Sequence, residues 1–246
     1  MLIPKELSKR TPETGASMAI KAIVSYDDTP NDHDALMLGR VLADAGAELT
    51  LVYVRHTTEI ESAREQLEEH EAEALLERGA RTLGDIPVER RVVVSGSTAD
   101  GIRWLVQEEG ADIAVFGSEY RTAAGHVQPQ KSAQELLEGG PAAVAIAPAN
   151  YRSEHATRFG RIGILAAPGD DAAIETARGL AESLGARVTR DEPHVDLLVV
   201  GSRSEAPSGH VMITANAENE IENATSPVLV VPRGVTIRFP VALAAA

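Results

Sequence analysis

The sequence predicts an α/β protein with an open parallel five-stranded sheet and helices on both faces, followed by a second, truncated copy of this unit. Two observations support the prediction. Short apolar runs alternate with amphipathic stretches along the chain, and residues 112–148 are repeated at 196–232. At this offset of 84 positions, eleven of the 37 residues are identical without a gap. A repeat at a fixed period indicates related structural units in tandem.

The first unit alternates strands and helices. An apolar run at 22–26 predicts the first strand, and the helix after it has apolar residues at i, i+3, i+4 and i+7, beginning at Leu38. Thr29 is a suitable N-cap for this helix, Pro30 suits its first position, and Asp32 falls at N3. The remaining elements are strand 48–54, an acidic helix at 58–79, strand 89–94, a helix capped by Ser97 that contains Ile102, Leu105 and Val106, strand 112–117, helix 132–139 and strand 142–148.

The second unit is shorter than the first. Its expected elements are strand 161–167, helix 170–185, strand 186–190, strand 196–201, helix 216–223 and strand 227–232. Few residues connect Thr189 to Asp196, although a parallel crossover normally takes a dozen or more, so this connection is unexplained. The chain is thus divided into a leader at 1–18, a first domain at 19–148, a linker at 149–160, a second domain at 161–234 and a tail at 235–246.

Composition excludes several classes of protein. The net charge of −14 disfavours nucleic-acid partners and anionic membrane surfaces, and 3% aromatic residues provide few platforms for stacking bases. The absence of cysteine excludes disulfides, thiolate zinc sites and cysteine nucleophiles. Because the leader lacks an apolar core and no later apolar run approaches about 18 residues, we expect a soluble, cytoplasmic protein. Nineteen arginines against four lysines suggest a GC-rich bacterial genome.

One acidic stretch, SYDDTPNDHD at 25–34, is a candidate site. Asp27 and Asp28 lie at the carboxyl end of the first strand, the edge where open α/β sheets bind ligands. The start of the helix explains Asp32, His33 and Asp34, and we expect His33 to face solvent. A receiver-type Mg²⁺ site would also need an Asp after a middle strand and a Lys after the last one, and both are missing. We therefore predict neither a catalytic residue nor a metal site.

The second candidate is the loop GSEYRTAAGHVQPQKSA at 117–133. A glycine-containing loop that leads into a helix can hold phosphates on its backbone N–H groups. The candidate residues are Gly117, Ser118, Gly125, Lys131 and Ser132. The alternatives are a tight turn that needs its glycines for backbone reasons alone, and a solvated lysine at the start of a helix.

With these residues placed, the chain resembles a tandem-domain universal stress protein over about 130 residues of the first unit and about 75 of the second. The resemblance implies a HUP/Rossmann-like sheet with strand order 3-2-1-4-5. It places Asp27 where the family contacts adenine, and it places the Val54 backbone near the base. In the family's Gly-x2-Gly-x9-Gly-Ser/Thr loop, Gly117 matches the first glycine, but Tyr120 and Gln130 replace the other two.

The loop resembles a family variant more closely, with these residues in register: Gly125, His126, Val127 and Ala133. The second unit has Ala166 and Ala167 after its first strand, so we expect no nucleotide there. The resemblance implies a non-catalytic stress-response protein with a partial pocket for ATP or AMP in its first domain. Its two domains would pair through their last strands, 143–147 and 228–231, and chains would associate further as a homodimer. The alternatives are a ligand-free interaction module with an unidentified protein partner, and a weak ATPase.

Overall fold

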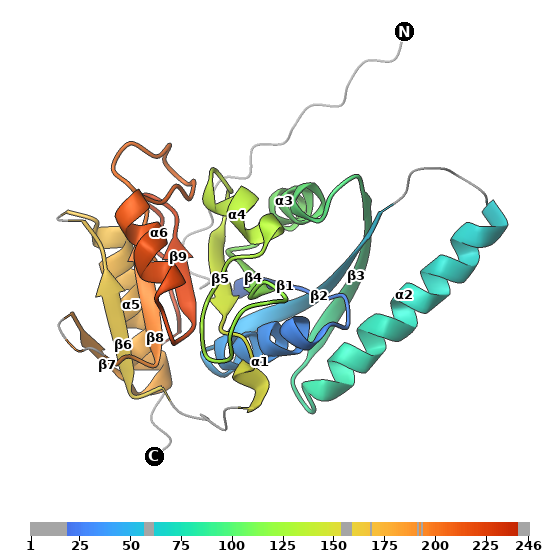
Figure 1. The fold of residues 1–246 in the computed structure, drawn as a ribbon, viewed down its shortest axis with the longest axis horizontal. Helices are drawn as coiled ribbons and strands as arrows, with labels where there is room; N and C mark the ends of the chain where they lie inside the picture. The colour runs from blue at the N-terminus through green and yellow to red at the C-terminus, as the bar shows by residue number, and fades with distance from the viewer. Residues whose placement is uncertain are drawn as a thin grey trace, which may run out of the picture.

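The computed structural model describes residues 19–56, 62–153, 159–167, 169–190, 192 and 194–240, with the side chains of 62–68 excepted. Strands and helices alternate along these residues, as the sequence predicted (Figure 1). The strands are β1 (Ile20–Ser25), β2 (Ala47–His56), β3 (Val88–Ser95), β4 (Ile113–Gly117), β5 (Ala143–Ala147), β6 (Arg161–Leu165), β7 (Arg187–Thr189), β8 (Leu197–Gly201) and β9 (Val228–Val231). The helices are α1 (Pro30–Asp44), α2 (Ser62–Thr82), α3 (Thr98–Glu109), α4 (Lys131–Leu137), α5 (Asp171–Leu184) and α6 (Ala215–Glu222), with a 3-10 turn, η1 (Tyr151–Ser153).

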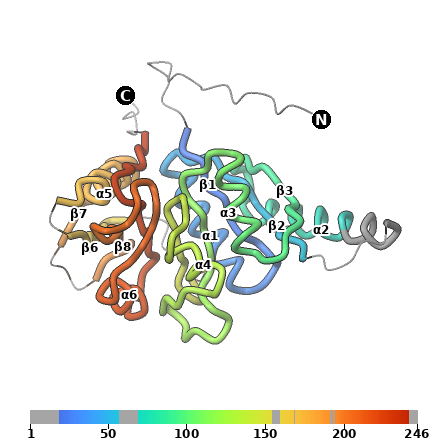
Figure 2. Tube along the Cα trace, turned by 90° about the horizontal axis from the view of Figure 1, so that it is seen from above, coloured from blue at the N-terminus to red at the C-terminus, as the bar shows by residue number. Residues whose placement is uncertain are grey.

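All nine strands form one sheet in the order β3-β2-β1-β4-β5-β9-β8-β6-β7. The predicted order 3-2-1-4-5 and its parallel pairing are confirmed in the first half. The sheet is larger than the predicted five strands because β5 is hydrogen-bonded to β9, and the second half continues from there. Figure 2 shows the two halves side by side from above.

The predicted helix starts are confirmed for α1 and α3. The Thr29 hydroxyl accepts a hydrogen bond from the backbone N–H of Asp32, and the Asp32 side chain completes a capping box. Ser97 caps α3 by accepting from the N–H of Asp100. The end predicted for the acidic helix is wrong by three residues: α2 runs on to Thr82, after which Leu83 enters the core. The expected start of that helix, at 58–61, lies outside the described residues.

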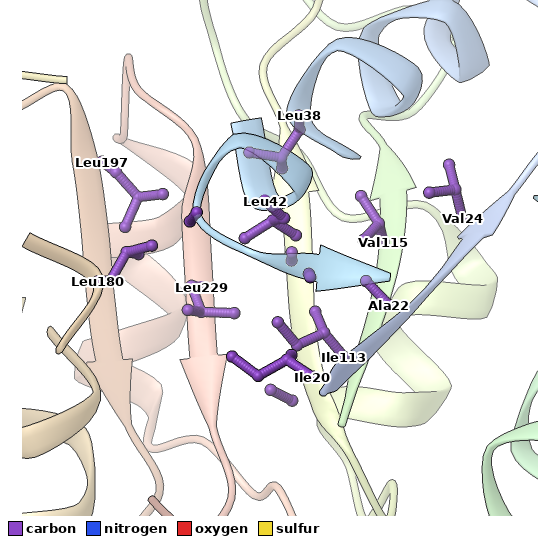
Figure 3. Close-up of a cluster of buried hydrophobic side chains, with 14 of the residues drawn as sticks. Ile20, Ala22, Val24, Leu38, Leu42, Ile113, Val115, Leu180, Leu197 and Leu229 are labelled. Atoms are coloured by element: carbon purple, nitrogen blue, oxygen red, sulfur yellow. The ribbon is translucent and has the colours of Figure 1, made fainter. Parts of the chain in front are cut away.

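Apolar side chains from both halves share a core on one face of the sheet. This face is covered by α1 and α5, and its cluster includes Leu42 of the first half and Leu180 and Leu229 of the second (Figure 3). The opposite face carries α3, α4 and α6 with a second cluster that also spans both halves. The halves therefore do not have separate hydrophobic cores.

The junction between the halves obeys the offset of 84 found in the sequence. In the antiparallel ladder between β5 and β9, Ala145 pairs with Leu229, its own equivalent 84 positions later. Two hydrogen bonds outside the ladder are equivalent in the same way. The N–H of Val127 donates to the carbonyl of Ala224 (3.1 Å), and the N–H of Val211 donates to the carbonyl of Gly140 (2.9 Å). Each half thus gives the other the same contact that it receives, as in a two-fold symmetric interface.

The unexplained connection from β7 to β8 is short because β7 is short. Thr189 ends β7 opposite Gly163 of β6, and Leu197 starts β8 opposite Ile162, so the chain moves back by only one residue along the sheet. It must still cross β6, which separates the two strands. Val195 makes this crossing against Gly163, where an added Cβ would lie 3.0 Å from its Cγ1. The glycine provides the room that the crossing requires.

Residues 235–240, assigned to the tail from the sequence, are packed between the halves. Ile237 and Phe239 are buried, and the N–H of Ile237 donates to the Thr176 hydroxyl on α5 (3.0 Å). Pro240 lies against Gly46, just beyond the end of α1. This segment therefore bridges helices of both halves. Among the described residues, no helix has the length and hydropathy needed to cross a bilayer.

Candidate functional site

Asp27 follows β1 at the carboxyl edge of the sheet, where it is exposed. Its backbone N–H donates to the Asp32 carboxylate (3.0 Å), which also accepts from the Thr29 N–H (3.1 Å). No described residue donates a hydrogen bond to the Asp27 carboxylate itself. Burial raises the pKa of Asp27, and the charge of Asp32 raises it further. The turn therefore fixes the backbone of Asp27 and leaves its carboxylate available to a ligand.

Asp28, by contrast, is fully engaged by the protein. The Arg78 guanidinium donates two hydrogen bonds to its Oδ2, from Nε (3.0 Å) and Nη2 (2.8 Å), and the Tyr26 hydroxyl donates to its Oδ1 (2.7 Å). The bonds from Tyr26 and Arg78 lower the pKa of Asp28. Its φ of 59° lies in the left-handed region, which these contacts stabilise. Asp28 therefore fastens α2 to the turn after β1.

His33, expected to face solvent, does so only in part, with 31% of its side chain exposed. Its Nε2 lies 3.2 Å from Oδ1 of Asp28, and its ring packs edge-on against Tyr26 with centroids 5.6 Å apart. Tyr26 is itself 1% exposed, and burial together with the bond to Asp28 raises its pKa. The reason is geometric, since the first turn of α1 folds back over the end of β1. His33 belongs to the same network as Asp28.

Asp34 also does more than start a helix. It is 0% exposed, and its carboxylate accepts hydrogen bonds from the N–H groups of Asn150 and Arg152, both at 2.8 Å. The Arg152 guanidinium, which is itself partly exposed, adds an ion pair at 2.9 Å. Asp34 thus anchors the chain as it leaves β5, and the first part of the expected linker is held in place.

Gly117 and Ser118 both have structural tasks. A Cβ at Gly117 would overlap the backbone carbonyl of Asn31, so only glycine allows the start of α1 to approach β4 this closely. The Asn31 amide donates to the carbonyl of Ser118 (2.6 Å). The Ser118 hydroxyl is buried and donates to the carbonyl of Ala147 (2.7 Å), the last residue of β5. Neither residue needs a ligand to explain it.

The rest of the loop presents little to a phosphate. Gly125 has a φ of 79°, and its N–H donates to the carbonyl of Ala149 (2.7 Å). The Lys131 side chain is 89% exposed and lies 3.9 Å from the Glu135 carboxylate, as expected for a solvated lysine. Ser132 is half-buried in the first turn of α4. Gly125 and Lys131 therefore have separate surroundings, and the loop does not bring them together at one ligand.

At the end of β2, Val54 is buried beneath α3, where a Cβ at Gly101 would lie 2.8 Å from its Cγ1. His56, two residues on, is exposed, and its Nε2 lies 3.1 Å from the Thr98 hydroxyl. The charge of His56 lowers the pKa of Asp27, which opposes the effect of burial. Sequence reasoning missed His56, although its position at the carboxyl end of the second strand was a signal.

The equivalent edge of the second half holds a carboxylate that the sequence did not suggest. Asp170 caps α5 by accepting from the Ala173 N–H (3.3 Å). Its other oxygen is buried against Gly201 without a hydrogen-bond partner among the described residues, and burial raises its pKa. No group of three or more acidic, histidine or cysteine side chains in the described part of the chain could hold a metal ion.

Residues 18–148, which contain Asp27 and the loop that starts at Gly117, match the model of the universal stress protein family. The chain belongs to this family. Among solved structures, a universal stress protein from Archaeoglobus fulgidus DSM 4304 is 15% identical, with a TM-score of 0.66 over 88% of this chain and 100% of that one. A functionally unknown protein from Pseudomonas aeruginosa PAO1 is 14% identical, with a TM-score of 0.61 over 88% and 93% of the two chains. No curated protein matches the sequence.

At such identities, the two structures show that this universal stress protein shares their fold over most of its length. The family match itself covers the first half only. Membership of the family supports a role in stress response. The site geometry then separates Asp27, whose carboxylate has no described hydrogen-bond donor, from the residues that the fold already uses.

Proposed function

We propose that this universal stress protein is a non-catalytic stress-response protein with a built-in pairing partner. Its first half would keep the adenine side of a nucleotide pocket, and its second half would take the place of a second subunit. The observation that carries the pairing is the reciprocal junction, in which equivalent groups of β5 and β9 meet about a single axis. The second half thereby covers the edge of β5, which would otherwise expose unpaired backbone groups.

A fragment tests this pairing. Residues 1–153 alone would expose the edge of β5 and the apolar side chains that the second half covers, so we expect a fragment that folds, as shown by circular dichroism, to dimerise in light scattering. A folded, monomeric fragment would contradict the proposal. Association of full-length chains into a homodimer is a separate expectation, and light scattering of the intact protein tests it.

The nucleotide part of the proposal rests on Asp27. Its carboxylate has no described hydrogen-bond donor and lies at the position where the family contacts adenine. The phosphate side is weak, because Gly117 and Ser118 are engaged by the protein and Gln130 replaces a glycine. We therefore expect AMP, ADP and ATP to bind with similar affinity, with dissociation constants of about 1 mM.

Calorimetry of the intact protein with the three nucleotides tests this expectation. Asp27→Asn should remove the measurable heat, since a hydrogen bond to a charged group contributes about 1.5–3 kcal/mol, or more than tenfold in affinity. Asp171→Asn makes the same charge change at an exposed position of the second half and should leave binding intact. No heat with any nucleotide at millimolar concentration would end this part of the proposal.

Two other functions remain as competitors. A ligand-free interaction module is favoured by one observation, namely that Asp28, Gly117 and Ser118 are all occupied by contacts within the protein. Mass spectrometry of the protein purified without added ligand separates the two readings, because a co-purifying nucleotide would exclude the ligand-free module. A weak ATPase would instead show steady phosphate release that Asp27→Ala abolishes.

A further inference from the structure

A large cleft of about 1110 Å³ lies at the amino edge of the sheet, opposite the edge that carries Asp27. It is bounded by the first residues of β2 and β3, the last turns of α1 and α3, and the turn at 83–87 between α2 and β3. The universal stress protein function proposed above does not use this edge.

The lining of the cleft is acidic. It carries three basic side chains, Lys21, Arg40 and Arg91, and six carboxylates: Asp44, Glu48, Asp85, Glu89, Glu108 and Glu109. Arg91 already pairs with Glu89 and Glu109, each at 3.1 Å. The other four carboxylates have no ion pair or hydrogen bond with any described residue. The cleft therefore presents more negative charge than the protein neutralises.

The ends of two helices add to this charge. α1 ends at Asp44 and α3 ends at Glu109, and neither helix has a basic residue in its last turn. At α3 the Lys21 ammonium already donates to the carbonyl of Glu109 (3.1 Å), so the end of α1 is the one without a described cation. A helix C-terminus carries a partial negative charge that a cation stabilises. Both helices point this end at the same edge, because helices that connect parallel strands run opposite to them. The helix ends and the acidic side chains thus both favour a positively charged ligand.

Thr50 supplies a polar group that has no partner among the residues that the structure describes. It lines the cleft from β2 and is only 8% exposed, yet no described residue is hydrogen-bonded to its hydroxyl. The hydroxyl oxygen is not among the fully buried atoms that lack a partner, so it is accessible from the cleft, where a ligand can donate a hydrogen bond to it. Glu48 lies two residues earlier in the same strand and therefore on the same face of the sheet. Thr50 and Glu48 can accept from one ammonium group together.

Apolar side chains separate the charged parts of the cleft. Leu49, Ile86 and Val88 line it alongside the free carboxylates Asp44 and Asp85. An extended cation with several ammonium groups joined by methylene segments matches this alternation better than a compact metal ion does, because three carboxylates do not converge anywhere among the described residues. We propose that the cleft binds a linear polyamine, with Thr50 and Glu48 as acceptors for one of its ammonium groups.

Calorimetry of the intact protein with spermidine tests the proposal. Glu48→Gln combined with Glu108→Gln should weaken binding by about fivefold to twentyfold, since each exposed ion pair contributes up to about fivefold. Glu218→Gln combined with Glu222→Gln removes the same charge from exposed positions on α6 and should leave binding unchanged. Thermal unfolding verifies that each variant is folded.

Thr50→Val distinguishes a specific site from general attraction to an acidic protein. It changes no charge and keeps the shape of the side chain, and we expect a severalfold loss of spermidine affinity. Equal affinity in both pairs of glutamine variants, or full displacement by Mg²⁺ at matched ionic strength, would overturn the proposal. Asp27→Asn should leave spermidine binding intact, so failure of the nucleotide proposal would not be mistaken for failure of this one.

Discussion

Replacement of Asp34 by asparagine should destabilise the protein by about 3 kcal/mol. The carboxylate accepts from two backbone N–H groups at 2.8 Å and from the Arg152 guanidinium at 2.9 Å. The side-chain oxygen of asparagine can still accept from one of these donors. Its NH₂ group then faces another donor, with which it cannot form a hydrogen bond. A buried N–H left without an acceptor costs about 1–3 kcal/mol, and a broken buried ion pair costs about 3–5 kcal/mol. The Arg152 side chain is 36% exposed and can be hydrated when the ion pair is broken, so we expect a loss of stability at the lower end of the range for a buried pair.

Thermal and urea unfolding followed by circular dichroism measure this loss. For a chain of this size, about 3 kcal/mol corresponds to a fall of about 6–12 °C in melting temperature. Asp44→Asn is the matched control, because Asp44 is exposed on the same helix and has no described partner; it should change stability by less than about 0.5 kcal/mol. A loss below about 1 kcal/mol for Asp34→Asn would refute the reasoning that this pair holds the chain after β5.

Three further perturbations test other parts of the structure. Burial raises the pKa of Tyr26 above its unfolded value near 10. The stability that the protonated tyrosine contributes is therefore complete below about pH 10 and is lost as the pH rises further. In urea unfolding, Tyr26→Phe should lose less stability than wild type between pH 8 and 10.5. Phe239→Ala should cost about 3 kcal/mol in thermal unfolding, whereas the exposed neighbour Arg238→Ala should be neutral. Gly163→Ala should cost about 1–2 kcal/mol, and Val195→Ala in the same chain should restore part of it; additive losses would contradict the close crossing.

The sequence predicted the features that depend on local pattern. Strand and helix positions followed from periodicity, and the capping of α1 by Thr29 followed from residue types at fixed spacing. The repeat at an offset of 84 indicated two related units, and the equivalent contacts at the junction have that same offset. The local features were accessible because neighbouring residues determine them, and the repeat was accessible because it can be read by comparing the sequence with itself.

Features that depend on distant partners were not accessible in this way. Asp34 meets Asn150 and Arg152, which lie 116 and 118 positions away, and Asp28 meets Arg78, which lies 50 positions away. A signal did exist for Asp34, because it lies four residues before Leu38 on the apolar stripe of α1 and should therefore point inward. The partners themselves could not be named before the fold brought them together.

The covalent link across the β5–β9 junction changes how this protein can respond to dilution and to mutation. Tethered partners meet at an effective concentration in the millimolar range, so their association does not depend on how much protein the cell makes. In a pair of identical subunits, every substitution appears on both sides of the axis at once. Here the turn after β1 keeps Asp27 while the turn after β6 has Ala166, so one side can retain a ligand while the other is released from that constraint. A single chain can thus carry an asymmetric pair that no homodimer could encode.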